Sequence, residues 1–205
     1  SGATFVQHDA TNGGANSLFR NLGDFNFSNI TKEVGLDQNN TRYSFAATWE
    51  DIDNDGDLDL YVANDYGRNN IYRNDREKGF KDIATGTSAE DSAFGMGVTV
   101  GDYDRDGWMD FYVSNMWSSA GQRITTQDQF KPSAPEVKQR LQRFAQGNSL
   151  LRNRGGGEFE AVPQAAGAAI GRWAWGSQFV DFNNDGWQDL VVANGFMSAS
   201  DDGDL

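Results

Sequence analysis

The 205-residue sequence contains no cysteine and only one histidine, His8. The absence of cysteine excludes disulfide bonds and thiolate metal sites. A nucleophile elbow and a zinc-binding motif are also missing. His8 lies near the N-terminus and fits a loop residue better than a catalytic base. We therefore expect that the protein is not an enzyme.

Basic residues are also few. The chain has 17 Lys and Arg but 30 Asp and Glu, so its net charge is −13. An acidic chain of this kind binds a phosphate backbone poorly, so we expect no nucleic-acid partner. No apolar run is long enough to span a bilayer and no signal peptide is visible, which predicts no membrane insertion. If the protein is exported, its signal lies outside these residues.

The acidic residues concentrate in three nine-residue segments with one pattern, at residues 51–59, 102–110 and 181–189. Oxygen-bearing side chains occupy positions 1, 3, 5 and 9, and glycine occupies position 6. Calcium takes six to eight oxygen ligands, and glycine permits the sharp turn that such a loop needs. The candidate ligands are Asp51, Asp53, Asp55, Asp59, Asp102, Asp104, Asp106, Asp110, Asp181, Asn183, Asp185 and Asp189.

A solvated Asp-Gly turn could explain one such segment, but three in the same register favour calcium. An EF-hand is excluded because position 12 is Val62, Val113 or Val192 rather than glutamate. Three Ca²⁺ ions would change the formal charge from −13 to −7. Loops of weak or moderate affinity fill where calcium is near millimolar, so we expect a secreted, extracellular or periplasmic location.

The segments around the loops predict short antiparallel strands. Buried strands are expected directly after the loops, at 60–64, 111–115 and 190–194. Partner strands rich in small residues are expected before the loops, at 44–50, 94–101 and 173–180. An Asn-x-x-x-Arg-Asn motif predicts a third strand at 16–21, 69–74 and 148–153, and Phe27, Phe80 and Phe159 mark a fourth. Four antiparallel strands in about fifty residues are typical of a β-propeller blade.

The sequence therefore predicts an all-β propeller segment, residues 1–205, without a dividing linker. Its parts are the tail of an earlier blade (1–43), a blade (44–93), a blade with an insertion at 117–147 (94–172), and a partial blade (173–205). The two ends could share one blade, although three blades are few for a closed ring. We expect a piece of a longer propeller, or completion of the sheet by another chain.

A helix is expected inside the insertion, over residues 133–146. Ser133 would cap it, with Pro135 in the first turn and Glu136 three residues on. Val137, Leu141 and Phe144 share one face, and the other side is basic through Lys131, Lys138, Arg140 and Arg143. That basic side is either a solvated surface or an element that docks a partner.

These motifs resemble the FG-GAP/VCBS repeat of integrin alpha subunits and many secreted bacterial proteins. The likeness rests on Phe94-Gly95, the acidic loops and the Asn-x-x-x-Arg-Asn motif, and it is closest to the cartilage acidic protein-like (ASPIC/UnbV) group. Residues 16–36 and 173–196 carry that closer likeness. The resemblance implies that the position-7 residues Asp57, Trp108 and Trp187 bind calcium through their carbonyls. It also implies that Asn183 weakens the third site.

These observations predict an extracellular calcium-binding scaffold or adhesion module that contacts a protein or a glycan, with calcium in a structural role. The alternatives are a lectin-like propeller and part of a polysaccharide-degrading enzyme, catalytic or not. Trp108 and Trp187 are expected to be exposed within the loops, whereas Trp49, Trp173 and Trp175 are expected in the core.

Overall fold

The structure is a computed structural model and describes residues 9–195. His8 and the end of the predicted partial blade, residues 196–205, lie outside this range. Within the range, neither α-helix is long and apolar enough to cross a bilayer.

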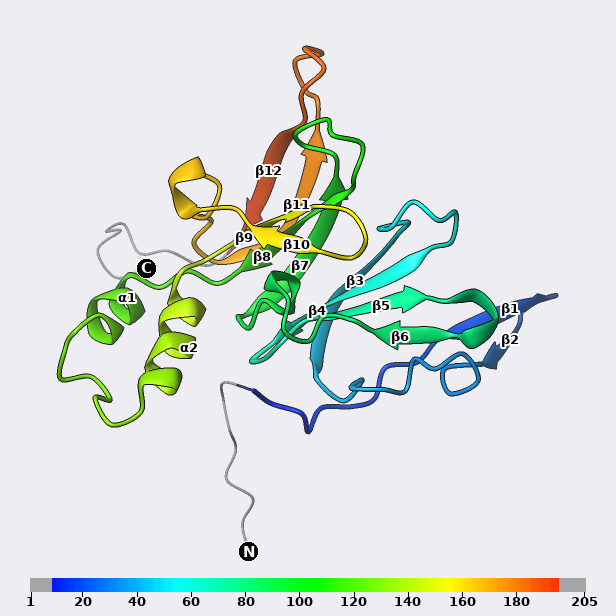
Figure 1. Ribbon diagram of the computed structural model, residues 1–205, viewed down its shortest axis with the longest axis horizontal. Helices are drawn as coiled ribbons and strands as arrows, with labels where there is room; N and C mark the ends of the chain where they lie inside the picture. Colours follow the sequence, from blue (N-terminus) through cyan, green and yellow to red (C-terminus); the bar gives the residue numbers. More distant parts are fainter. Residues whose placement is uncertain (1–8, 196–205) are drawn as a thin grey trace, which may run out of the picture.

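Two four-stranded antiparallel sheets form the centre of the molecule (Figure 1). The first blade contains, in spatial order, β3 (Tyr43–Glu50), β4 (Asp59–Asp65), β5 (Asn70–Asn74) and β6 (Phe80–Asp82). The second blade contains β7 (Gly95–Gly101), β8 (Asp110–Asn115), β9 (Ser149–Asn153) and β10 (Phe159–Ala161). The predicted class, all-β with four-stranded antiparallel blades, is confirmed.

A two-stranded hairpin flanks this pair of blades on each side (Figure 1). The N-terminal hairpin pairs β1 (Phe19–Gly23) with β2 (Asn26–Asn29), and the C-terminal hairpin pairs β11 (Ala174–Val180) with β12 (Asp189–Asn194). They are separate sheets, so the two ends do not form a shared blade among the described residues. β7 packs against β3 on one side and β11 on the other.

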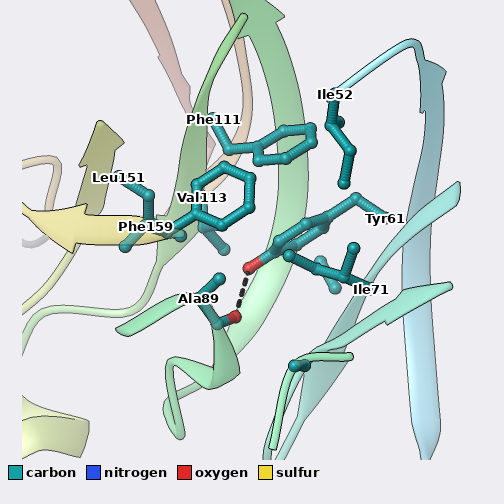
Figure 2. Close-up of a cluster of buried hydrophobic side chains, with 10 residues drawn as sticks. Ile52, Tyr61, Ile71, Ala89, Phe111, Val113, Leu151 and Phe159 are labelled. Atoms are coloured by element: carbon teal, nitrogen blue, oxygen red, sulfur yellow. Dashed lines mark hydrogen bonds between the residues drawn. The ribbon is translucent and has the colours of Figure 1, made fainter. Parts of the chain in front are cut away.

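The main hydrophobic core lies between the two complete blades (Figure 2). The rings of Tyr61 from β4 and Phe111 from β8 lie 4.5 Å apart, and the Tyr61 hydroxyl donates to the carbonyl of Ala89 at 3.1 Å. Ile52 enters this core from the first acidic loop. One loop is therefore anchored directly in the contact between blades.

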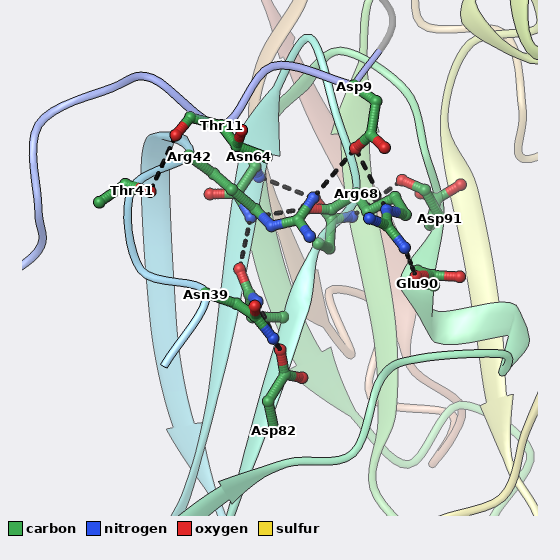
Figure 3. Close-up of polar contacts among 12 residues, drawn as sticks. Asp9, Thr11, Asn39, Thr41, Arg42, Asn64, Arg68, Asp82, Glu90 and Asp91 are labelled. Atoms are coloured by element: carbon green, nitrogen blue, oxygen red, sulfur yellow. Dashed lines mark hydrogen bonds and ion pairs between the residues drawn. The ribbon is translucent and has the colours of Figure 1, made fainter. Parts of the chain in front are cut away.

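The N-terminal segment is fixed to the first blade by ion pairs (Figure 3). Asp9 contacts Arg42 at 3.4 Å and Arg68 at 3.1 Å, and Arg68 also contacts Glu90 at 2.7 Å. A smaller apolar cluster, which includes Leu36 beside the first blade, supports the same segment.

Glycine is required where the blades approach each other. A side chain at Gly95 would place its Cβ 2.9 Å from the carbonyl oxygen of Asn64 and 3.2 Å from Oδ1 of Asn69. The pairing of the first with the second strand shifts register at the same place in each unit. The shift lies between Ser44 and Ala46 in β3 and at the equivalent positions in β7 and β11. The repeat thus reproduces a local irregularity as well as the strands.

The insertion contains two helices rather than the single one predicted. α1 spans Ser119–Thr125 and α2 spans Pro135–Ala145, while short 3₁₀ turns lie elsewhere at η1 (Arg76–Lys78), η2 (Ser88–Glu90) and η3 (Gln164–Ala166). The prediction that Ser133 caps the second helix is wrong, because Ala134 occupies the cap and makes no side-chain bond. Proline disfavours a helical conformation in the residue before it, so Pro135 fixes the start one residue later.

The predicted apolar face of α2 packs on the blades through Phe144, whose ring lies 4.6 Å from that of Phe94. The prediction of a free basic side does not hold for Arg143, because its Nε donates to Asp91 Oδ1 at 2.9 Å. Lys138 is also engaged, because its Nζ donates to the carbonyl of Gln127 at 2.7 Å. Two of the four basic residues therefore fasten the insertion instead of forming a free surface.

Burial differs between the central and flanking strands. β4 and β8 are buried along their whole length, as predicted, but Val191 in β12 is 56% exposed. Trp49 and Trp175 are also exposed, which contradicts their expected place in the core. Val191 and Trp49 lie on sheet faces against which the described residues place no neighbouring blade.

Replacing Gly95 with alanine should lower the free energy of unfolding by about 1–3 kcal/mol, because the new Cβ meets main-chain atoms that cannot move aside. The matched control is Gly176→Ala, where no atom lies within 4 Å of the added Cβ. Urea unfolding followed by circular dichroism measures both. Equal effects of the two variants would contradict the packing argument.

Replacing Arg143 with methionine should cost about 2–4 kcal/mol, because it leaves the Asp91 carboxylate buried without its cation. The side chain of Asp91 is only 3% exposed. Adding Asp91→Asn to the same chain should recover most of the loss, which a double-mutant cycle from urea titrations measures. A double variant no more stable than Arg143→Met would show that the pair matters little.

Candidate metal centres

Three acidic loops connect the first and second strands of the two blades and of the C-terminal hairpin (Figure 1). Two positions adopt the left-handed backbone conformation in all three. Position 6 is always glycine, with φ between 87° and 90°. Position 4 has φ between 56° and 63° and is occupied by Asn54, Arg105 and Asn184. The recurring sequence therefore produces one recurring backbone.

The first aspartate of each loop organises the turn. Both of its oxygens accept main-chain amides, Oδ1 from position 5 at 3.0 Å and Oδ2 from position 6 at 2.9–3.1 Å. The amide of position 7 donates to Oδ1 of position 5 at 2.8–3.0 Å. Aspartate forms such local turns readily, which explains why it recurs at positions 1 and 5.

Two loops bring three carboxylates together. Oxygens of Asp51, Asp53 and Asp59 lie within 4.8 Å of one another, and so do those of Asp102, Asp104 and Asp106. Calcium–oxygen distances are about 2.3–2.6 Å, so ligands on opposite sides of one ion are about 5 Å apart. The donor chemistry and the spacing of both clusters fit calcium. Asp55 and Asp110 lie outside these tight groups.

Asp53 gives a separate indication that a cation fits the first loop. Its Oδ1 is buried and has no hydrogen-bond partner among the described residues. Burial raises the pKa of this carboxyl, and the nearby Asp55 raises it further. A divalent ion would satisfy the oxygen and remove the repulsion between the two aspartates.

The position-9 aspartates have a second role that the sequence did not reveal. Asp59, which is 1% exposed, accepts the amides of Ile52 at 3.1 Å and Asn74 at 2.7 Å. Asp110, which is 0% exposed, accepts those of Tyr103 at 3.2 Å and Asn153 at 2.8 Å. Burial raises the pKa of Asp59 to about 6 and of Asp110 to about 7.

The partners of these carboxylates explain the Asn-x-x-x-Arg-Asn motif. Asn74 and Asn153 are its last residues, so the position-9 aspartate joins each loop to the third strand of its blade. The arginine of the motif also acts at the second loop, because Arg152 contacts Asp104 at 2.5 Å and donates to Asp106 at 2.9 Å. The motif was visible in the sequence, but its contact with the loop was not.

The first loop receives a different arginine. Arg76 contacts the carboxylate of Asp57 and donates to the carbonyl of Asp55 at 2.6 Å. Arg76 lies in the turn between β5 and β6, and no motif pointed to it. The structure therefore offsets part of the charge of two loops with guanidinium groups.

The third loop differs in its donor set. Asn183 replaces an aspartate, and its Nδ2 donates to Asp185 Oδ2 at 2.9 Å. No group of three carboxylates forms around Asp181, Asp185 and Asp189 in the described part of the chain. The lower affinity of this site stays a prediction, as does binding through the carbonyls of Asp57, Trp108 and Trp187.

Neighbouring loops contact each other. Asn54 Nδ2 donates to the carbonyl of Gly107 at 3.2 Å, and the Arg105 guanidinium lies 5.1 Å from the centre of the Trp187 ring. Trp187 is exposed, as expected, whereas Trp108 is half-buried beside Gly155. The three loops thus form one continuous row.

Comparison with protein families matches an FG-GAP-like repeat three times, at residues 5–62, 51–113 and 142–192. The chain belongs to the FG-GAP-like repeat family. The matches skip most of the insertion and include all three loops. A search of curated proteins found no match. Membership indicates a β-propeller-like protein-interaction module, and the acidic clusters of this member could hold a metal ion.

Replacing Asp110 with alanine should lower the free energy of unfolding by about 2–4 kcal/mol even without calcium, because two buried amides lose their acceptor. Urea unfolding in EGTA measures this loss. The matched control Asp106→Ala should cost less than about 1 kcal/mol there, because its hydrogen bonds from the Trp108 amide and from Arg152 lie at the surface, where water can replace them. Equal losses would contradict the separate structural role of position 9.

Proposed function

We propose that this FG-GAP-like repeat chain is an extracellular or periplasmic calcium-binding scaffold that presents its blades to a protein or glycan partner. The main observation behind this proposal is the shared geometry of the three loops. Each loop has the same turn and the same amide contacts, and each connects the first and second strands of its unit. In this proposal calcium is structural rather than catalytic. The ASPIC/UnbV-like features at residues 16–36 and 173–196 support an exported protein of that group.

The groups that calcium would contact support a structural role. Asp59 and Asp110 link their loops to the third strands, so an ion held beside them would connect distant segments of one blade. The first and third loops touch the second, so three ions would also brace the row. The ions would neutralise carboxylates that otherwise repel one another.

A non-catalytic role is supported by the ionisable groups outside the loops. Asp91 pairs with Arg143, and Glu90 pairs with Arg68 at 2.7 Å. In the described part of the chain, both carboxylates therefore hold segments together through arginine.

Removing calcium should strongly destabilise the fold. A site at 100 times its dissociation constant contributes about 2.7 kcal/mol, so three sites approach the stability of a typical domain, about 5–15 kcal/mol. Thermal unfolding in about 10 mM CaCl₂, which is about 100 times a Kd of about 10⁻⁴ M typical of extracellular modules, and again in excess EGTA measures the change. Isothermal titration should give three ions per chain, and two after Asp51→Ala. An unchanged melting temperature in EGTA would contradict the proposal.

A further inference from the structure

The arginine of the Asn-x-x-x-Arg-Asn motif makes different contacts in the two complete blades. In the second blade, Arg152 contacts the carboxylate of Asp104 at 2.5 Å and donates to that of Asp106 at 2.9 Å. Both carboxylates belong to the clustered group of three in the second loop. In the first blade, the counterpart Arg73 donates instead to Asp75 Oδ1 at 2.8 Å, outside the first loop. A guanidinium therefore joins two of the candidate calcium ligands in the second loop.

The residue two places after each arginine explains this difference. Asp75 follows Arg73 and gives it a carboxylate partner outside the loop. Arg154 stands at the same place after Arg152, and because like charges repel, it favours the position of Arg152 at the acidic loop. A basic residue in place of an acidic one therefore directs the second arginine to the candidate ligands.

The first loop receives its guanidinium at other atoms. Arg76 contacts the carboxylate of Asp57 and the carbonyl of Asp55, and neither residue belongs to the clustered carboxylates of that loop. In that cluster, Oδ1 of Asp53 is buried and has no hydrogen-bond partner among the described residues. The first cluster therefore offers a carboxylate oxygen that an ion could take without displacing a side chain.

A second acceptor for Arg152 lies on the fourth strand of its own blade. Glu160 in β10 is directly opposite Arg152 in β9, and side chains directly opposite each other in an antiparallel pair are close neighbours. In the structure, Glu160 pairs with Arg154, whose Nε donates to its Oε2 at 2.8 Å. That pair is exposed, so exchanging it costs little. In the first blade, Lys81 lies opposite Arg73 and offers no carboxylate.

We propose that Arg152 competes with calcium in the second loop. Arg152 holds the carboxylates of Asp104 and Asp106 when calcium is absent, and it turns to Glu160 when calcium is bound. The guanidinium and a divalent ion attract the same oxygens, so the displacement of Arg152 lowers the calcium affinity of this loop. The first loop then fills at a lower calcium concentration than the second. This inference rests on the proposed calcium-binding function and adds the order in which the two loops fill.

The first test is isothermal titration of the complete chain with CaCl₂. Arg152→Met should raise the calcium affinity of one site about tenfold, because it removes the charged competitor. The matched control Arg73→Met removes the same charge at the equivalent position and should change each affinity less than about threefold, because it acts through a screened field rather than a contact. Adding Asp102→Ala to Arg152→Met should abolish the gain, which assigns it to the second loop. Circular dichroism checks that each variant is folded.

The second test follows Arg152 itself. Nuclear magnetic resonance detects the Nε–H groups of arginines, and the loss of one signal in Arg152→Met identifies that of Arg152. This signal should move when CaCl₂ is added, and the signal of Arg73 should move less. Glu160→Gln removes the alternative acceptor and should lower the affinity of the second loop about threefold. The matched control Glu158→Gln removes the same charge from an exposed residue of the same turn and should have a smaller effect.

The outcomes separate this inference from the proposed function. If the unmodified chain binds no calcium, the proposed function fails and the inference fails with it. Calcium binding might instead persist while Arg152→Met and Arg73→Met change the affinities equally, or while the Arg152 signal stays in place. Either result would leave the calcium sites standing and overturn the competition by Arg152.

Discussion

A buried carboxylate that accepts two main-chain amides is the interaction on which each blade depends. Asp59 and Asp110 each bind the start of an acidic loop and the end of a third strand, which lie far apart in the sequence. The amides stabilise the charge, but burial still raises the pKa of both groups. A divalent ion held beside them would relieve that remaining cost. The loop and the strand pairing are therefore parts of one arrangement, and a metal ion bound there would belong to it.

Features that are specified within one repeat could be predicted from the sequence. The acidic loops, the strands beside them and the four-stranded antiparallel blades follow from local spacing, turn chemistry and apolar alternation. The family comparison and the sheet order agree with that part. The loop geometry also follows from spacing, because Asp51 and its counterparts build the same turn from contacts no more than five residues away.

Features that depend on contacts between units could not be predicted. Trp49 resembles a core residue, but its burial depends on a neighbouring blade that residues 9–195 do not place beside it. Arg143 has the helical position of a solvated cation, yet Asp91 from a distant connection binds it. The contact of Arg152 with the second loop also requires strand pairing across the insertion. Sequence patterns predict the face of a strand or helix on which a residue lies. The surface that packs against that face is determined by the tertiary structure.

The position of the insertion determines how mechanical force would travel through the molecule. α1 and α2 connect β8 to β9 at the end of the sheet away from the acidic loops (Figure 1). Tension on these helices passes through Arg143 to Asp91, in the connection that leads into β7, and through Phe144 to Phe94. The load is therefore shared between both blades before it reaches any acidic loop. A ligand could pull on this end while the row of loops at the other end keeps its geometry.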